Sequence, residues 1–219
     1  MVEHPFETNA AEYDAWYDAN PNAFSAEVAA IECVLPMHRG RWVEIGVGSG
    51  RFAEALGIPI GIEPAYAMAQ LARARGINVL SGTAESLPLA TGSVDAAFLI
   101  TALCFIADPA VAFAEVERVL KPGGCLIAGF LPLDSPLGES VARTADTNAF
   151  FAHARLRTRA ALCSSLTNSG FSIDARRNTL HGNPDTFDAY VHEAREGSDG
   201  GSFVVVRAQL IQPGVQGVS

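Results

Sequence analysis

The chain has 219 residues, 49% of them hydrophobic and 18% charged, a composition typical of one compact globular domain. Its formal net charge of −9 argues against partners that are bound through a phosphate backbone, because that affinity depends on lysine and arginine. The longest apolar run, 96–107, is too short to cross a bilayer. We therefore expect neither a nucleic-acid partner nor a membrane span.

The first residues, MVEHPFETNAAEYD, are acidic and lack a basic segment followed by an apolar core. No signal peptide is expected, and a cytoplasmic location is predicted. The cysteines show no CxxC spacing and the histidines no HExxH spacing, so neither disulfides nor a metal site is predicted. We expect four buried free thiols, at Cys33, Cys104, Cys125 and Cys163.

Helical patterning opens the chain over 9–19 and 22–35, with Pro21 suited to a helix start. Strand-like apolar runs then alternate with amphipathic segments as far as Phe130. This alternation predicts right-handed βαβ units and a parallel sheet that is covered on both faces. The strands are expected at 41–45, 58–62, 77–80, 94–100 and 124–130, and the helices at 50–56, 64–75 and 108–120.

The regular alternation of strand and helix patterns ends after residue 130. Helical character runs to about 153 and again over 158–168, and two further strands are expected at about 171–180 and 202–209. No convincing crossover helix separates these two strands, so they should be antiparallel. The sequence predicts a doubly wound, Rossmann-like α/β fold, with a seven-stranded, mostly parallel sheet, an antiparallel final strand pair and helical lid elements. We expect a single domain over 1–219, divided into a helical lid (1–35), a cofactor-binding core (40–130), a helical cap (131–170) and the final strands (171–210).

The stretch VEIGVGSGRF, residues 43–52, reads as a strand, a glycine turn and a helix, an arrangement that cradles ligands. A triphosphate loop is excluded because no lysine follows the glycines. A dinucleotide fingerprint would need glycine where Arg51 stands, and it places a pyrophosphate at the start of the helix, near Glu44. S-adenosylmethionine suits this site better, because it carries an ammonium, a sulfonium and a single carboxylate.

At this point the sequence resembles the class I S-adenosylmethionine-dependent methyltransferases, especially the branch related to the ubiquinone and menaquinone biosynthesis enzymes. Five blocks occur in the order of that family: VEIGVGSG, GIEPAYAM, GTAESLPL, SVDAAFLITALCFIADP and VLKPGGCLIAGF. Outside this core, AAEYDAWYD is similar to the family's N-terminal lid helix. The segment FFAHARLRTRAALCSSLTNSGF is similar to the one that precedes the last two strands.

The resemblance implies S-adenosyl-L-methionine as cofactor and assigns contacts to it. Glu63 would accept hydrogen bonds from the ribose hydroxyls, Met68 would stack on the adenine, and Thr101 would touch the methionine moiety. Thr83 stands where relatives often carry an acid or amide, so the adenine contacts there would come from backbone N–H groups and Glu85.

The tyrosines of the first helix would cover the cofactor carboxylate, although their helical spacing with Trp16 also suits a stripe facing the core. The predicted cofactor-binding set is Tyr13, Tyr17, Glu44, Gly46, Gly48, Gly50, Glu63, Met68, Thr83, Ala84, Glu85 and Thr101.

The reaction implied is in-line methyl transfer to a nitrogen, oxygen, sulfur or carbon atom of a small-molecule acceptor. Because the cofactor carries the difficult chemistry, the protein need supply only positioning and a dry pocket. His153 is the candidate general base, and Cys104 is expected to be a pocket wall. The first helix and residues 148–155 would form an aromatic roof over 101–105. Two alternatives stay open: a nicotinamide-dependent oxidoreductase, and a non-catalytic S-adenosylmethionine-binding protein.

Overall fold

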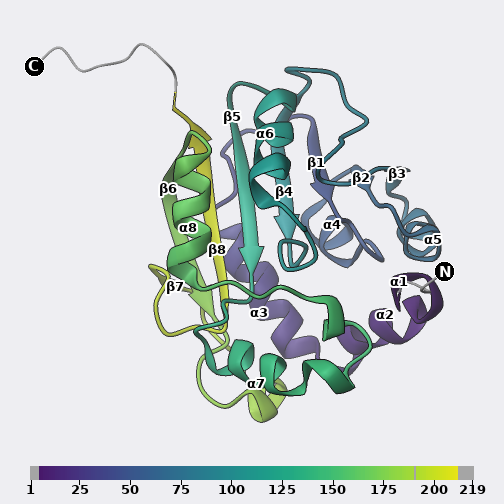
Figure 1. The fold of residues 1–219 in the computed structure, drawn as a ribbon, viewed down its shortest axis with the longest axis vertical. Helices are drawn as coiled ribbons and strands as arrows, with labels where there is room; N and C mark the ends of the chain where they lie inside the picture. Colours follow the sequence, from purple (N-terminus) through teal and green to yellow (C-terminus); the bar gives the residue numbers. More distant parts are fainter. Residues whose placement is uncertain (1–4, 190, 212–219) are drawn as a thin grey trace, which may run out of the picture.

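The structure is a computed structural model and describes residues 5–189 and 191–211. In these residues one eight-stranded sheet runs in the order β3-β2-β1-β4-β5-β8-β6-β7 (Figure 1). The first five strands of the chain pair in parallel, as the alternation of strand and helix predicts. They are β1 (Trp42–Ile45), β2 (Ile60–Ile62), β3 (Asn78–Leu80), β4 (Val94–Ile100) and β5 (Leu120–Phe130).

The predicted antiparallel final pair is confirmed. β8 (Phe203–Leu210) lies between β5 and β6 (Phe171–Thr179) and is antiparallel to both. The expected count of seven strands is one too low, because β7 (Arg195–Glu196) pairs along the outer edge of β6. Two residues are too few to produce a recognisable strand pattern in a sequence.

Helices cover both faces of the sheet. One apolar core packs α3 (Pro21–Glu32), α4 (Arg51–Leu56) and α5 (Tyr66–Ala74) against residues such as Phe98 and Ile127. The core on the opposite face packs α6 (Pro109–Val119) and α8 (Arg159–Asn168) against residues such as Leu99 and Leu126. Neighbouring residues of a strand point to opposite faces, so each buried strand supplies both cores.

The remaining helices lie along the carboxyl edge of the sheet, with α7 beyond the end of β5 and with α1 and α2 on the side of α5 (Figure 1). They are α1 (Pro5–Thr8), α2 (Ala10–Ala19), α7 (Pro136–Thr144) and the short turns η1 (Ala145–Thr147), η2 (Phe151–His153) and η3 (Pro184–Ala189). The Asp188 carboxylate accepts a 2.6 Å hydrogen bond from the backbone N–H of Asn22, which ties η3 to the start of α3. Parts of the chain that are distant in sequence therefore meet at this edge.

The four cysteines are free, as expected, but only Cys125 is buried; Cys33 is exposed and the other two are partly buried. The expectation of four buried thiols is therefore wrong, because Cys33 ends α3 at the surface. Among the described residues no helix combines the length and apolar character needed to cross a bilayer.

Candidate active site

A cavity of about 490 Å³ lies at the carboxyl ends of β1, β2 and β4. This is the edge where doubly wound sheets bind ligands, and the volume is that of an ordinary small-molecule site. Most of the cofactor-binding residues predicted from the sequence line it: Tyr13, Gly46, Gly48, Glu63, Met68, Thr83, Ala84, Glu85 and Thr101.

The glycine turn forms one wall of the cavity. Gly46, Gly48 and Gly50 have φ angles of 71°, 55° and 87°, which L-residues with side chains rarely adopt. A Cβ at Gly46 would lie 2.8 Å from the Cβ of Ala102, whereas a Cβ at Gly48 would meet nothing within 4 Å. The backbone of Gly48 is therefore open to close approach by a ligand, and Gly46 allows the turn to pack on the loop after β4.

Glu63 follows β2 and faces the turn. Its Oε2 accepts a 2.8 Å hydrogen bond from the Gly48 N–H, and its Oε1 accepts a 2.9 Å bond from the Ala65 N–H. Burial raises the pKa of this carboxyl, while the two backbone bonds act to lower it. Because a carboxylate oxygen accepts more than one hydrogen bond, both oxygens keep capacity for the paired hydroxyls of a ribose.

The part of the cavity wall formed by Met68 and residues 83–85 is suited to a flat ring. Met68, on α5, is 1% exposed and borders the cavity. The loop opposite it is closed by a 3.2 Å hydrogen bond from the Ser86 N–H to the Thr83 carbonyl, which presents Thr83, Ala84 and Glu85 to the cavity.

Thr101 ends β4 with a φ of 54°, an unusual angle for a β-branched residue. Its N–H donates to the Gly129 carbonyl over 2.8 Å, and its hydroxyl donates to the Ile100 carbonyl over 2.8 Å. These bonds hold a strained backbone at the cavity wall, and residues in such conformations gather at functional sites.

Aromatic rings close the far end of the cavity. The Phe6 ring lies 5.4 Å from that of Tyr13, 4.9 Å from that of Phe105 and 5.6 Å from that of Phe150. Phe151 stacks on Phe105 with a centroid separation of 6.4 Å. The expected aromatic roof therefore includes Tyr13, Phe150 and Phe151, together with Phe6, which the sequence interpretation missed.

Glu7 fastens α1 across the cavity. Its carboxylate accepts hydrogen bonds from the N–H groups of Tyr66 and Ala67, at 2.6 and 3.0 Å, in the first turn of α5. A negative charge is favoured at a helix N-terminus, so this contact stabilises the packing of α1 on α5. Nothing in the sequence around Glu7 signals this contact, because it depends on how α1 packs on α5.

The charges that line the cavity are of one sign. Glu7, Glu63 and Glu85 border it, and in the described part of the chain no lysine, arginine or histidine does. A pyrophosphate would be repelled here, whereas a ligand with sulfonium and ammonium charges would be attracted. The open glycine backbone, the paired acceptors of Glu63 and the acidic lining all fit S-adenosylmethionine.

Comparisons with known proteins identify the family to which the chain belongs. A family model described as a methyltransferase domain matches residues 43–128. An uncharacterized protein of Mycobacterium tuberculosis is 37% identical over 204 residues, covering 91% of this chain and 72% of that protein. An uncharacterized protein of Methanocaldococcus jannaschii is 34% identical over 206 residues, which cover 94% of this chain and 98% of that protein.

A crystal structure from Thermotoga maritima superposes with a TM-score of 0.90 at 39% identity, covering 95% of this chain and 99% of that one. It is described as an S-adenosylmethionine-dependent methyltransferase, possible histamine N-methyltransferase. The present chain belongs to the S-adenosylmethionine-dependent methyltransferases. Its cofactor is therefore S-adenosylmethionine, and the nicotinamide and non-catalytic alternatives are wrong.

Arg51, which breaks the dinucleotide fingerprint, has a structural role in this methyltransferase. Its guanidinium donates to the carboxylates of Asp14 and Asp18 at 2.8 and 2.7 Å and so fastens α2 to α4. Partial burial acts to raise the pKa of Asp14, but hydrogen bonds from Arg51, Ser49 and Arg75 lower it to about 2.

Glu44 and Gly50 are predicted cofactor contacts that lie outside the cavity lining of the methyltransferase. Side chains alternate along β1, so Ile45 borders the cavity while Glu44 lies on the other face and is 1% exposed. Burial raises the pKa of Glu44 well above its usual range, and its Oε2 has no hydrogen-bond partner in the described residues. Gly50 is the N-cap residue of α4, where an added Cβ would lie 2.9 Å from the Ala72 Cα.

Tyr17 and His153 also lie away from the cavity. Tyr17 is buried against the rings of Phe24 and Phe52, at 5.2 and 5.8 Å, so it belongs to the core. Trp16, on the same helix, is 45% exposed. His153 lies exposed in η2 and lines neither described cavity, because the short turn directs it to the surface.

Cys104 lines a second, small cavity that shares Thr101 with the first. Its volume is about 10 Å³, which is of the order needed for one water molecule. Burial raises the pKa of the Cys104 thiol to about 12, so the group stays protonated near neutral pH, as a pocket wall should.

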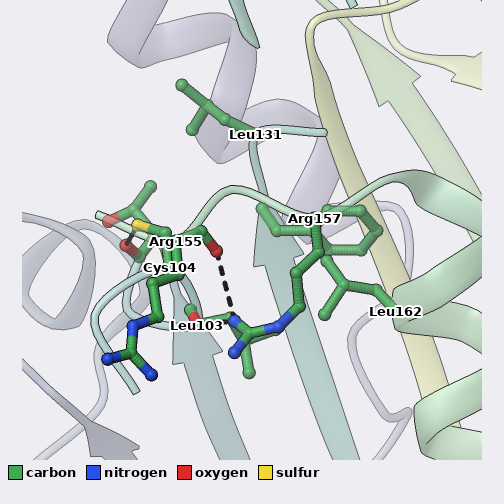
Figure 2. Close-up of a pocket in the computed structure, with 8 residues that line it drawn as sticks. Leu103, Cys104, Leu131, Arg155, Arg157 and Leu162 are labelled. Carbon is green, nitrogen blue, oxygen red and sulfur yellow. Dashed lines mark hydrogen bonds between the residues drawn. The ribbon is translucent and has the colours of Figure 1, made fainter. Parts of the chain in front are cut away.

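The loop after β4 is held by Arg157. Figure 2 shows the Arg157 guanidinium turned toward Leu103 and Arg155. It donates to the Leu103 carbonyl over 3.0 Å and to the Ile106 carbonyl over 3.3 Å. This arginine therefore fixes the segment that carries Phe105 into the roof.

Proposed function

We propose that this methyltransferase transfers a methyl group, by in-line displacement, to a small-molecule acceptor with a flat or apolar body. The observation that carries the proposal is the aromatic roof of Phe6, Tyr13 and Phe105 over an apolar floor that includes Ile100 and Ala102. Such a chamber excludes water from the transfer and gives a flat acceptor a large contact area.

An amine nitrogen is the acceptor atom that we favour. The Thermotoga maritima relative is described as a possible histamine N-methyltransferase. The acidic lining of the cavity tolerates a neutral or cationic acceptor and disfavours an anionic one. The net charge of −9 disfavours nucleic-acid acceptors, and we retain the cytoplasm as the proposed location.

The assignments made from the resemblance become part of the proposal. Glu63 holds the ribose, Met68 and residues 83–85 hold the adenine, and Thr101 lies at the methionine end. The proposed division is a lid over 1–35, a core over 40–130, a cap over 131–170 and final strands over 171–210. Membership of the ubiquinone and menaquinone branch rests on the five sequence blocks alone.

When bound, S-adenosylmethionine supplies an electrophilic methyl group. The protein contributes position: the glycine turn and Glu63 fix one end of the cofactor, and the roof aligns the acceptor with the other end. Alignment of this kind can supply roughly 7–11 kcal/mol of barrier lowering.

Product analysis with a methyl-labelled donor tests the proposal. The enzyme is incubated with panels of aromatic amines, phenols, thiols and carboxylic acids. We expect labelled product from one class of flat acceptor, most readily the amines. Labelling confined to nucleic acid or protein acceptors would contradict the proposal.

A further inference from the structure

We propose that the methyl acceptor carries a carboxylate at a distance from its reacting nitrogen, and that Arg155 binds this carboxylate beside the active site. The inference deepens the proposed function and rests on it, because both concern the same acceptor. Two observations carry it: a second cavity adjoins the large one, and the guanidinium of an arginine at this second cavity is free.

The two cavities adjoin along the loop that follows β4. Thr101 lines both of them. Ala102 and Phe105 line the large cavity, whereas Leu103 and Cys104, which lie between them in the sequence, line the small one. An acceptor held at the Thr101 end of the large cavity therefore has its far end close to the small cavity.

The small cavity differs from the large one in charge. Its charged lining residues are Arg155 and Arg157, and the rest of its wall is mostly apolar, with Phe130, Leu131 and Leu162. The carboxylates that disfavour an anion line only the large cavity. A reacting amine therefore suits the large cavity, and an anionic group at the other end of the acceptor suits the small one.

Only one of the two arginines is available to a ligand. The Arg157 guanidinium donates to the backbone carbonyls of Leu103, Arg155 and Ile106 at 3.0, 3.2 and 3.3 Å. The side chain of Arg155 is exposed and makes no hydrogen bond or ion pair with any described residue. Figure 2 shows its guanidinium apart from that of Arg157, below Cys104.

The main chain of Arg155 is fixed, although its guanidinium is free. Its N–H donates to the Cys104 carbonyl over 2.6 Å, and its carbonyl accepts the bond from Arg157. The Leu133 N–H in turn donates to the Arg157 carbonyl over 2.9 Å, so this segment bridges the loops after β4 and β5. A guanidinium on a fixed backbone loses less freedom when it binds a ligand.

A carboxylate suits Arg155 better than a phosphate does. The planar fork of a guanidinium pairs with the two oxygens of a carboxylate, and one positive charge balances one negative charge. A phosphate monoester carries more charge, and no second free cation lines either cavity in the described part of the chain. The small cavity, of about 10 Å³, does not admit a ring, so the carboxylate would lie at its rim, where Arg155 is exposed.

Matched acceptors test the proposal by turnover. Para-(aminomethyl)benzoate is compared with para-(aminomethyl)benzamide, in which a neutral amide replaces the carboxylate, and histidine is compared with histamine. In each pair that is methylated, the wild type should favour the carboxylate by about 10-fold in kcat/KM, mainly through KM, because a charged hydrogen-bonded pair is gained.

Arg155→Met should remove this preference and leave the neutral acceptors unaffected. Arg155→Lys should recover part of it, because lysine keeps the charge but lacks the fork. Arg143→Met is the matched control, since this exposed arginine of α7 lines neither cavity, and it should behave as the wild type.

Calorimetry on the complex with S-adenosylhomocysteine gives a readout that needs no turnover. The wild type should bind para-(aminomethyl)benzoate more tightly than the benzamide, and Arg155→Met should bind the two equally. A preference that persists in Arg155→Met, equal binding of the pair by the wild type, or tighter binding of the phosphonate analogue would overturn the proposal. None of these results affects the proposed function, which fails instead if no small-molecule acceptor is methylated.

Discussion

The backbone N–H of Gly48 donates a 2.8 Å hydrogen bond to Oε2 of Glu63. This bond joins the glycine turn after β1 to the acid after β2, two segments that come from different βαβ units. The carboxylate is therefore oriented before any ligand arrives, and little ordering is needed when a ribose binds.

Glu63→Ala should weaken binding of S-adenosylhomocysteine by roughly 1.5–3 kcal/mol, because charged hydrogen bonds to the ribose and the Gly48 anchor are lost together. Titration calorimetry measures the change. Glu117→Ala, an exposed carboxylate on α6, is the matched control and should bind normally. Wild-type affinity in the Glu63 variant would remove this residue from the site.

Glu7→Ala should loosen the lid. The substitution removes the two hydrogen bonds to the start of α5, a contact of the kind that contributes about 0.5–2 kcal/mol. S-adenosylhomocysteine should then dissociate several-fold faster, as stopped-flow fluorescence would record. Glu12→Ala, exposed on α2, should leave the rate unchanged; equal dissociation rates in the two variants would mean that α1 does not gate the cavity.

Glu27 should make the stability of the fold depend on pH. Burial raises its pKa from 4.5 to about 8, so the folded chain binds this proton more tightly than the unfolded chain does. The free energy of unfolding should therefore fall as the pH rises from about 4.5 to about 8, by roughly 5 kcal/mol from this group. Urea unfolding of Glu27→Gln should lack this component. A Glu27→Gln variant that loses stability over that range as steeply as the wild type would show that the group titrates normally.

His153→Ala should have almost no effect on the rate of methyl transfer. The side chain is exposed and lines neither cavity, so transfer should stay within about twofold of the wild-type rate, the usual range for surface substitutions. Initial rates across pH 6–9 provide the check. A loss of about 10²-fold that recovers as the pH rises would instead identify His153 as a general base.

Much of the cavity wall could be predicted, because each part of it has a recognisable local sequence pattern. The glycine turn needs positive φ angles, and Glu63 follows a short apolar strand at the expected distance from it. For Glu44 the local signal was misleading. Its carboxylate suits a cationic ligand, but side chains alternate between the two faces of β1, and the Glu44 side chain points away from the cavity. The structure shows the direction, because Ile45, the next residue of the strand, borders the cavity.

The lid could not be predicted in the same way. Phe6 and Glu7 acquire their roles through contacts with Phe105 and α5, which depend on tertiary packing alone. His153 was chosen by residue type, and no sequence pattern indicates which way a three-residue turn faces. The burial of Glu27 could have been predicted from the sequence, because this residue lies in a stripe of apolar residues spaced three and four positions apart along α3.

The most direct test of the account follows methyl-labelled S-adenosylmethionine through one reaction with a flat amine acceptor. With the cofactor held below its wild-type Kd, mass spectrometry should find labelled amine and S-adenosylhomocysteine in equal amounts, both reduced by about 10- to 150-fold in Glu63→Ala and retained in Glu117→Ala. A cofactor that binds the wild type but yields no labelled product with any small-molecule acceptor would contradict the account.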